Sequence, residues 1–164
     1  FSGGQPQAGF NANNQYTNLN PNRNYQPYLA QQVVNMLREE YKDTTIINCV
    51  LPNEPHYTDT IRCDLHWTQL HEMLKGAEGF VAIDSCLQHF SPSAKAYGVV
   101  VWGSTRWTQF GYSHNKNLHF HMKDEWDETK YVESDPRNVM VEPKLIIDSF
   151  KKLDKDKPVA CATK

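Results

Sequence analysis

Apolar residues along this chain alternate between short continuous runs and stretches with helical spacing. In residues 27–41, Leu29, Val33, Met36 and Leu37 recur at intervals that predict an amphipathic helix. Similar spacing predicts helices over 65–77, 88–97 and 143–153. Apolar runs bounded by turn residues predict strands over 44–50, 60–65, 79–83, 98–102 and 117–121.

The helix over 65–77 is expected to bury Trp67, Leu70, Met73 and Leu74 and to end near Gly76. Short strands that alternate with helices predict an α/β fold, with a doubly wound, mainly parallel Rossmann-like sheet. The Asn-rich residues up to 24 are expected to form a loop, and the charged residues 123–138 an irregular segment. We therefore expect one domain over 1–153 and a flexible tail over 154–164.

Composition narrows the classes of function. The net charge is −2, which gives no electrostatic case for nucleic acid or an anionic membrane as a partner. No apolar run reaches the roughly 20 residues of a transmembrane segment. The four cysteines form no CxxC pair, so we expect reduced thiols in a cytoplasmic protein, without a structural zinc site.

The stretch "FVAIDSCLQHFSPSAKAYGVVVWG", residues 80–103, carries the candidate chemistry. Open α/β sheets bind ligands beyond the carboxyl ends of their strands, where helix N-termini present free N–H groups. Asp84 there can accept hydrogen bonds from sugar hydroxyls, and the backbone amides of 85–89 can hold a phosphate. Gly103 and Thr105 follow the neighbouring predicted strand and would face the same crevice. The alternative is that Asp84 or Ser85 only caps the helix.

Residues 76–111 resemble the donor-site segment of glycosyltransferase family 9, the heptosyltransferase-like enzymes. The family pattern is a helix ending in "GA", a strand, D-[ST]-G-x-x-H-x-A-x-A, an apolar strand and then "fG-x-T". Asp84, Ser85, His89, Gly103 and Thr105 fall close to these positions. "VLPNEP" resembles the family's "G-x-x-x-E" turn, and "NRNYQPYLAQQVV" resembles its "K-x-W-P-x-x-x-x-x-x-L". The similarity spans roughly residues 1–115.

The resemblance implies the C-terminal, nucleotide-sugar-binding half of a two-domain enzyme that transfers glycosyl groups with inversion and without a metal or other cofactor. An ADP-heptose type of donor would be bound, and the general base would lie outside this chain. By position, Asp84 would contact the donor sugar, while Ser85, Cys86 and His89 would surround the diphosphate. Arg23 stands where the family has a phosphate-binding lysine, and Glu54 where an acid holds the ribose.

Three features depart from the family pattern: Cys86 replaces a glycine, Arg23 replaces a lysine, and the Asn-rich loop before Arg23 is longer. Cys86 and the Asn-rich loop favour the alternative of a non-catalytic binding or structural module within a larger assembly. An epimerase on a related scaffold is a third hypothesis, although its acid–base residues cannot be located. The family topology also has a central first strand that these residues lack. We therefore expect an upstream acceptor-binding domain or another chain to supply that strand.

Two other groups of residues remain open. His119 and His121 share a face of the predicted strand 117–121, so they are either metal ligands or exposed strand residues, and the latter is favoured. The aromatic residues Trp102, Trp107, Phe110 and Tyr112 are either core packing or a stacking wall for a base or sugar.

Overall fold

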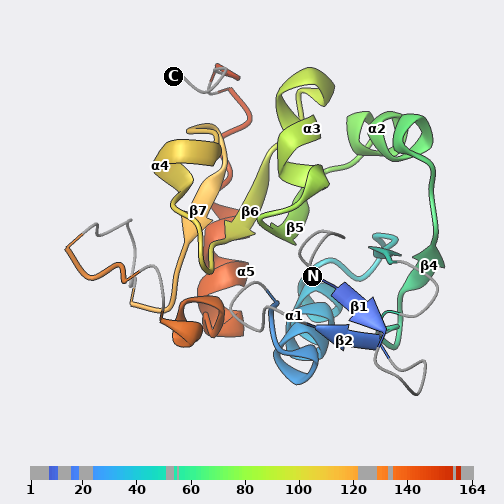
Figure 1. Cartoon of the computed structure of the whole chain (residues 1–164). Helices are drawn as coiled ribbons and strands as arrows, with labels where there is room; N and C mark the ends of the chain where they lie inside the picture. The colour runs from blue at the N-terminus through green and yellow to red at the C-terminus, as the bar shows by residue number, and fades with distance from the viewer. Residues whose placement is uncertain are drawn as a thin grey trace.

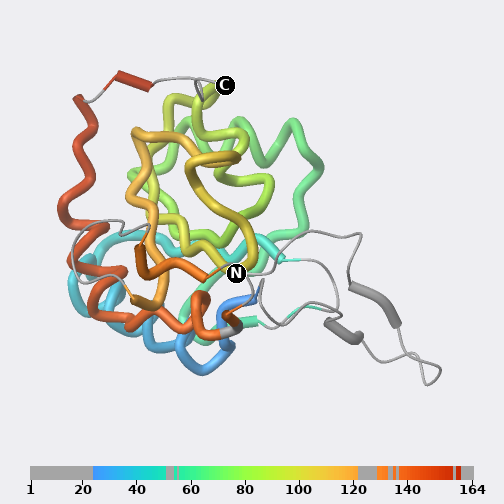
Figure 2. Tube along the Cα trace, turned by 60° about the vertical axis from the view of Figure 1, so that its left-hand side comes forward, coloured from blue at the N-terminus to red at the C-terminus, as the bar shows by residue number. Residues whose placement is uncertain are grey.

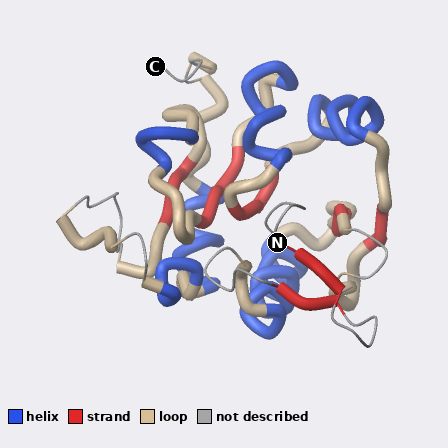
Figure 3. The backbone as a smooth tube through the Cα atoms, in the orientation of Figure 1, coloured by secondary structure: helices blue, strands red, loops and turns tan. Residues whose placement is uncertain are grey.

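The computed structural model describes residues 8–10, 16–18, 24–50, 54, 56–121, 129–132, 135–156 and 158–159. These residues form a mixed α/β structure whose helices pack on a small parallel sheet (Figures 1 and 3). The α/β class and the parallel pairing of the strands were predicted from the sequence.

The central sheet consists of three parallel strands in the order β5-β6-β7, with bounds Phe80–Ile83, Gly98–Val101 and Lys116–Leu118. Every residue of the middle strand β6 is buried, because helices cover both faces of the sheet. Val99 and Val101 pack into one core cluster, while Val100 packs into the other. Because successive side chains point to opposite faces of a strand, β6 contributes residues to both core clusters.

Helices α1 (Pro27–Glu40) and α5 (Pro143–Lys151) cover the first face of the sheet. Both begin with a proline in the first turn, where the missing N–H costs no helical hydrogen bond. Val33 and Val34 of α1 meet Ile146 and Ile147 of α5 in the larger core cluster. Figure 2 shows the two helices side by side.

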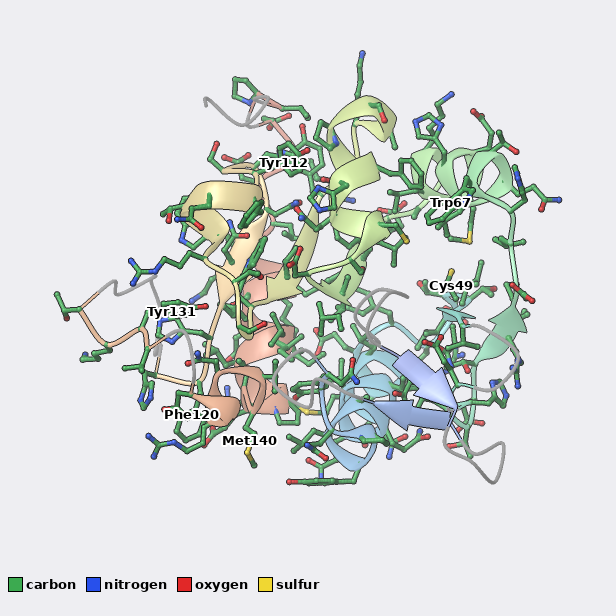
Figure 4. The ribbon with its side chains drawn as sticks, viewed as in Figure 1. Cys49, Trp67, Tyr112, Phe120, Tyr131 and Met140 are labelled. Atoms are coloured by element: carbon green, nitrogen blue, oxygen red, sulfur yellow. The ribbon has the colours of Figure 1, made fainter. Side chains whose placement is uncertain are left out.

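Helices α2 (Trp67–Lys75) and α3 (Cys86–Ala94) lie on the second face. Leu74 of α2 and Ala94 of α3 pack with Val100 and with Trp102, which is fully buried at the end of β6. The prediction that Trp67 points inward is wrong, because its side chain is 58% exposed. Trp67 is the first residue of α2 and its ring packs edge-on against Phe90 of α3, outside the sheet (Figure 4).

Several element boundaries differ from the predictions. Helix α3 begins at Cys86 and ends at Ala94, where Lys95 takes a left-handed conformation with φ of 53°. A one-turn helix α4 (Trp107–Phe110) and a 3-10 helix η3 (Pro136–Val139) lie where no helix was predicted. A short antiparallel pair, β1 (Ala8–Phe10) with β2 (Tyr16–Asn18), lies within the segment predicted to be a loop.

Two further strands, β3 (Ile47–Cys49) and β4 (Ile61–Cys63), pair in parallel as a separate sheet. The described residues therefore form two parallel sheets, and β3 does not pair with β5. The α/β class with parallel strands is confirmed, whereas the described residues do not show the single doubly wound sheet that was predicted. The domain boundary at residue 153 remains a prediction.

We expect Tyr25→Phe to destabilise the fold. The buried Tyr25 hydroxyl donates to the Val141 carbonyl at 2.6 Å and ties the start of α1 to the segment before α5. Without the hydroxyl this acceptor loses its partner, so the free energy of unfolding should fall by about 1–3 kcal/mol. Tyr28→Phe, on the exposed face of α1, should change it by less than about 0.5 kcal/mol. Urea unfolding of both variants measures the difference, and equal midpoints would contradict this role of Tyr25.

Candidate functional site at the carboxyl ends of β5 and β6

The loop after β5 places Asp84 and Ser85 between the strand and helix α3. Ser85 is the N-cap residue in an extended conformation, and its side chain makes no capping hydrogen bond. Burial raises the pKa of the Cys86 thiol at the first position of α3, and the nearby backbone N–H groups of Leu87 and Cys86 partly offset this rise. The simple capping explanation for Ser85 therefore does not apply.

Asp84 connects the two loops that the sequence placed at one edge of the sheet. The Thr105 hydroxyl donates to Asp84 Oδ2 at 2.7 Å, and the Asp84 side chain is 12% exposed. Thr105 lies in the loop Gly103–Thr105 after β6, so this bond joins the ends of neighbouring parallel strands. The predicted meeting of the two loops is present in the structure.

Gln88 and His89 of α3 approach the same carboxylate. Gln88 is fully buried and donates from Nε2 to Asp84 Oδ1 at 3.3 Å. His89 Nε2 lies 3.8 Å from the same oxygen, with 49% of its side chain exposed. An ionised carboxylate only accepts hydrogen bonds, so Asp84 would meet a ligand as an acceptor. His89 is exposed enough to contact a ligand, whereas Gln88 orients the carboxylate from inside.

Gly103 is fixed by residues that the sequence did not single out. The Tyr131 hydroxyl donates to its carbonyl at 2.8 Å, and Asn138 Nδ2 donates to the same oxygen at 3.2 Å. The Arg106 guanidinium lies over the Tyr131 ring, 5.4 Å from its centre (Tyr131 is labelled in Figure 4). Arg106 thus places a cation on the loop after β6. Arg106 could have been identified in the sequence by its position directly after Gly103-Ser104-Thr105.

The other two predicted donor contacts are placed differently. Glu54 is buried, and its charge is felt at Cys86 and Tyr57, where it raises both pKa values alongside the larger effect of burial. The pKa of Tyr57 reaches about 12. Arg23 lies outside the described residues.

The histidines after β7 are not both exposed strand residues. His119 is fully buried and stacks edge-on against Tyr131, and β7 already ends at Leu118. His121 Nε2 lies 3.3 Å from Asp135, a carboxyl group whose pKa is held well below its ordinary value chiefly by Arg137. In the described part of the chain, no group of three or more His, Cys, Asp or Glu residues is arranged to hold a metal ion.

The aromatic cluster divides between packing and the site. Trp102 is fully buried, and its indole N–H donates to Asn117 Oδ1 at 2.8 Å. Phe110 is exposed, and Tyr112 packs edge-on against the His89 ring with centres 6.2 Å apart (Tyr112 is labelled in Figure 4). Trp102 is therefore core, whereas Tyr112 borders the candidate site.

Thr105→Val is expected to loosen the two loops. Removing the hydroxyl takes a hydrogen bond from the partly buried Asp84 carboxylate, so the free energy of unfolding should fall by about 1.5–3 kcal/mol. Thr105→Ser keeps the donor and should stay within about 1 kcal/mol of the parent chain. Chemical denaturation of both variants tests the bond. A valine variant as stable as the serine variant would show that it contributes nothing.

Cys49 is expected to resist alkylation at neutral pH. Burial, with smaller contributions from nearby Cys63 and Cys86, raises the pKa of Cys49 to about 11. Because the thiolate is the reactive form, iodoacetamide at pH 7.5 should modify Cys49 more than about 100-fold more slowly than an unperturbed thiol. The rate should rise about tenfold per pH unit towards pH 11. Peptide mass spectrometry gives the rate, and reaction at the rate of the denatured chain would contradict the shift.

Comparison with known proteins adds no relatives: no family model, curated protein or solved structure matches this chain. Within the described residues, no helix has both the length and the apolar character needed to cross a membrane.

Proposed function

We propose that this chain is the donor-binding domain of a heptosyltransferase-like glycosyltransferase. It would bind a nucleoside diphosphate sugar of the ADP-heptose type for inverting, metal-independent glycosyl transfer. The observation that carries the proposal is the Asp84–Thr105 hydrogen bond, which assembles a polar site from the loops after β5 and β6. In open α/β sheets this edge is where nucleotides bind. The resemblance of the same residues to the donor motif supports the assignment.

Each residue of the site has a plausible chemical task. The Asp84 carboxylate would accept hydrogen bonds from the sugar, and half-exposed His89 would contact the diphosphate. The N-terminus of α3 and the guanidinium of Arg106 would stabilise the negative charge that builds on the departing diphosphate. Arg23 and Glu54 are proposed for the phosphate and the ribose. The general base would come from outside this chain.

Donor binding should depend on Asp84. In thermal-shift measurements with ADP-glucose, UDP-glucose and GDP-mannose, a donor at about 100 times its Kd should add about 2.7 kcal/mol of stability. For a chain of this size, that corresponds to a rise in Tm of about 5 °C or more. Asp84→Ala should lower the rise to the level that ADP alone gives, whereas Asp43→Ala, in an exposed turn, should retain it.

Isothermal titration calorimetry then separates the contribution of the sugar to binding from that of the diphosphate. ADP alone should still bind Asp84→Ala, because the diphosphate contacts lie on α3, whereas binding of the sugar-bearing donor should fall to the level of ADP. Equal affinity of the donor for the parent chain and for Asp84→Ala would remove Asp84 from the site. Circular dichroism of both variants checks that the fold is intact.

One observation favours a second function, a non-catalytic binding or structural module on the same fold. Cys86 is the first residue of α3, where the family pattern has a glycine, so its side chain lies beside the amides that a diphosphate would need. A chain that shows no Tm shift with any of the three donors or with ADP fits this alternative. Cys86→Gly removes this side chain, so a gain of ADP binding in that variant would identify a donor site obstructed by the thiol.

A further inference from the structure

Two cysteines lie directly opposite each other on neighbouring strands. Cys49 is the last residue of β3 and Cys63 is the last residue of β4, and the two are partners in the register of this parallel pair. Partners in a parallel ladder carry their side chains on the same face of the sheet. Both thiols are free and half-buried (Cys49 is labelled in Figure 4). The register therefore places two thiols at neighbouring positions on one face.

The spacing of the strands puts this pair within reach of a disulfide bond. Neighbouring strands lie about 4.8 Å apart, and a disulfide joins residues whose Cα atoms are about 4.4–6.8 Å apart. The Cβ atoms of a relaxed disulfide are closer together, at about 3.5–4.5 Å. Since strand side chains stand roughly perpendicular to the sheet, closing the bond has to draw the ends of β3 and β4 together. Strained disulfides are the ones that thiols reduce readily, so this bond would be reversible.

The face that carries the two thiols is partly covered and partly open. The Cys49 sulfur lies 3.9 Å from the sulfur of Met73, so helix α2 packs against this end of β3. Ile47 and Ile61, the partners two residues earlier on the same face, are 40% and 56% exposed. Solvent therefore reaches the sheet next to the cysteines, and a small soluble oxidant can do so as well.

A bond between the two cysteines would close the connection between β3 and β4. The closed loop runs over 15 residues from Cys49 to Cys63. This connection carries Tyr57, which packs in the larger core cluster, and the buried Glu54. A cross-link that closes a loop reduces the conformational freedom of the unfolded chain. The oxidised chain is therefore expected to hold this connection more firmly than the reduced chain.

We propose that Cys49 and Cys63 are a redox-active thiol pair that closes to a reversible disulfide with a small soluble disulfide, such as glutathione disulfide, as the oxidant. The bond locks the connection between β3 and β4. Among the cysteines that the structure describes, Cys86 begins helix α3, so Cys49 and Cys63 are the two that a strand register pairs. This inference does not depend on nucleotide-sugar binding.

The reaction consists of two thiol–disulfide exchanges. The Cys63 thiolate attacks one sulfur of glutathione disulfide, forms a mixed disulfide and releases one glutathione thiolate. The Cys49 thiolate then attacks the Cys63 sulfur, forms the protein disulfide and releases the second glutathione thiolate. The two released thiolates take up the two protons that the cysteines lost, so two protein thiols are oxidised and one glutathione disulfide is reduced. Burial raises the pKa of Cys49 to about 11, so its thiolate is scarce at neutral pH and the first attack is assigned to Cys63.

Incubation with glutathione disulfide, followed by peptide mass spectrometry, tests the pairing. The parent chain and the control variant Cys86→Ser should both give a peptide cross-linked between Cys49 and Cys63, which excess reduced glutathione reopens. Cys49→Ser should stop after the first exchange and keep a glutathione adduct on Cys63. In Cys63→Ser, the adduct on Cys49 should form at least about tenfold more slowly at neutral pH, because its thiolate is scarce. Circular dichroism checks that each serine variant is folded.

The closed bond should also change the stability and the pH dependence of the chain. The Tm of the oxidised parent chain should lie about 5 °C above that of the reduced chain, whereas the same oxidant should leave the Tm of Cys49→Ser unchanged. The rate of the second exchange should rise about tenfold per pH unit from neutral pH towards pH 11, because the thiolate fraction of Cys49 rises in this range.

Three results would overturn the proposal. The first is an oxidised parent chain in which Cys49 and Cys63 stay reduced or carry separate glutathione adducts, which would show that the two thiols serve only as packing. The second is a cross-link from either residue to another cysteine or to a second chain, which would show that the strand register does not direct the pairing. The third is the expected cross-link with an unchanged Tm, which would show that the bond does not lock the connection between the strands.

Discussion

The rest of the structure depends on the burial of β6 between two helical layers. Every residue of Gly98–Val101 is buried, and Trp102 extends this burial to the loop that follows. Burial on both faces requires a strand without polar side chains, and it requires the neighbouring strands to satisfy all backbone groups. At Gly98 this burial leaves no room even for a methyl group, because a Cβ would meet the Phe80 ring at 2.5 Å. The polar loops at the strand ends are held by this rigid element.

The sequence allowed prediction of the elements whose signals are local. The apolar runs of β5 and β6 and the spacing of α1, α2 and α5 were identified because a buried strand and an amphipathic helix show their pattern within a few residues. The burial of Trp67 was predicted wrongly because helical spacing does not show which residues of a helix extend beyond the sheet on which it packs. His119 was expected at the surface because period-two alternation was continued past the end of β7 at Leu118. Helix α4 spans one turn, too short for any periodicity to be read.

The meeting of the loops after β5 and β6 could be predicted because the position of a residue along a strand decides its place. Asp84 and Thr105 each lie one to four residues beyond neighbouring parallel strands, so topology alone brings them together. Gln88, Tyr131 and Asn138 could not be found in this way. Each contacts a site residue that is 4 to 35 positions away in the sequence, and each contact depends on the direction of a side chain.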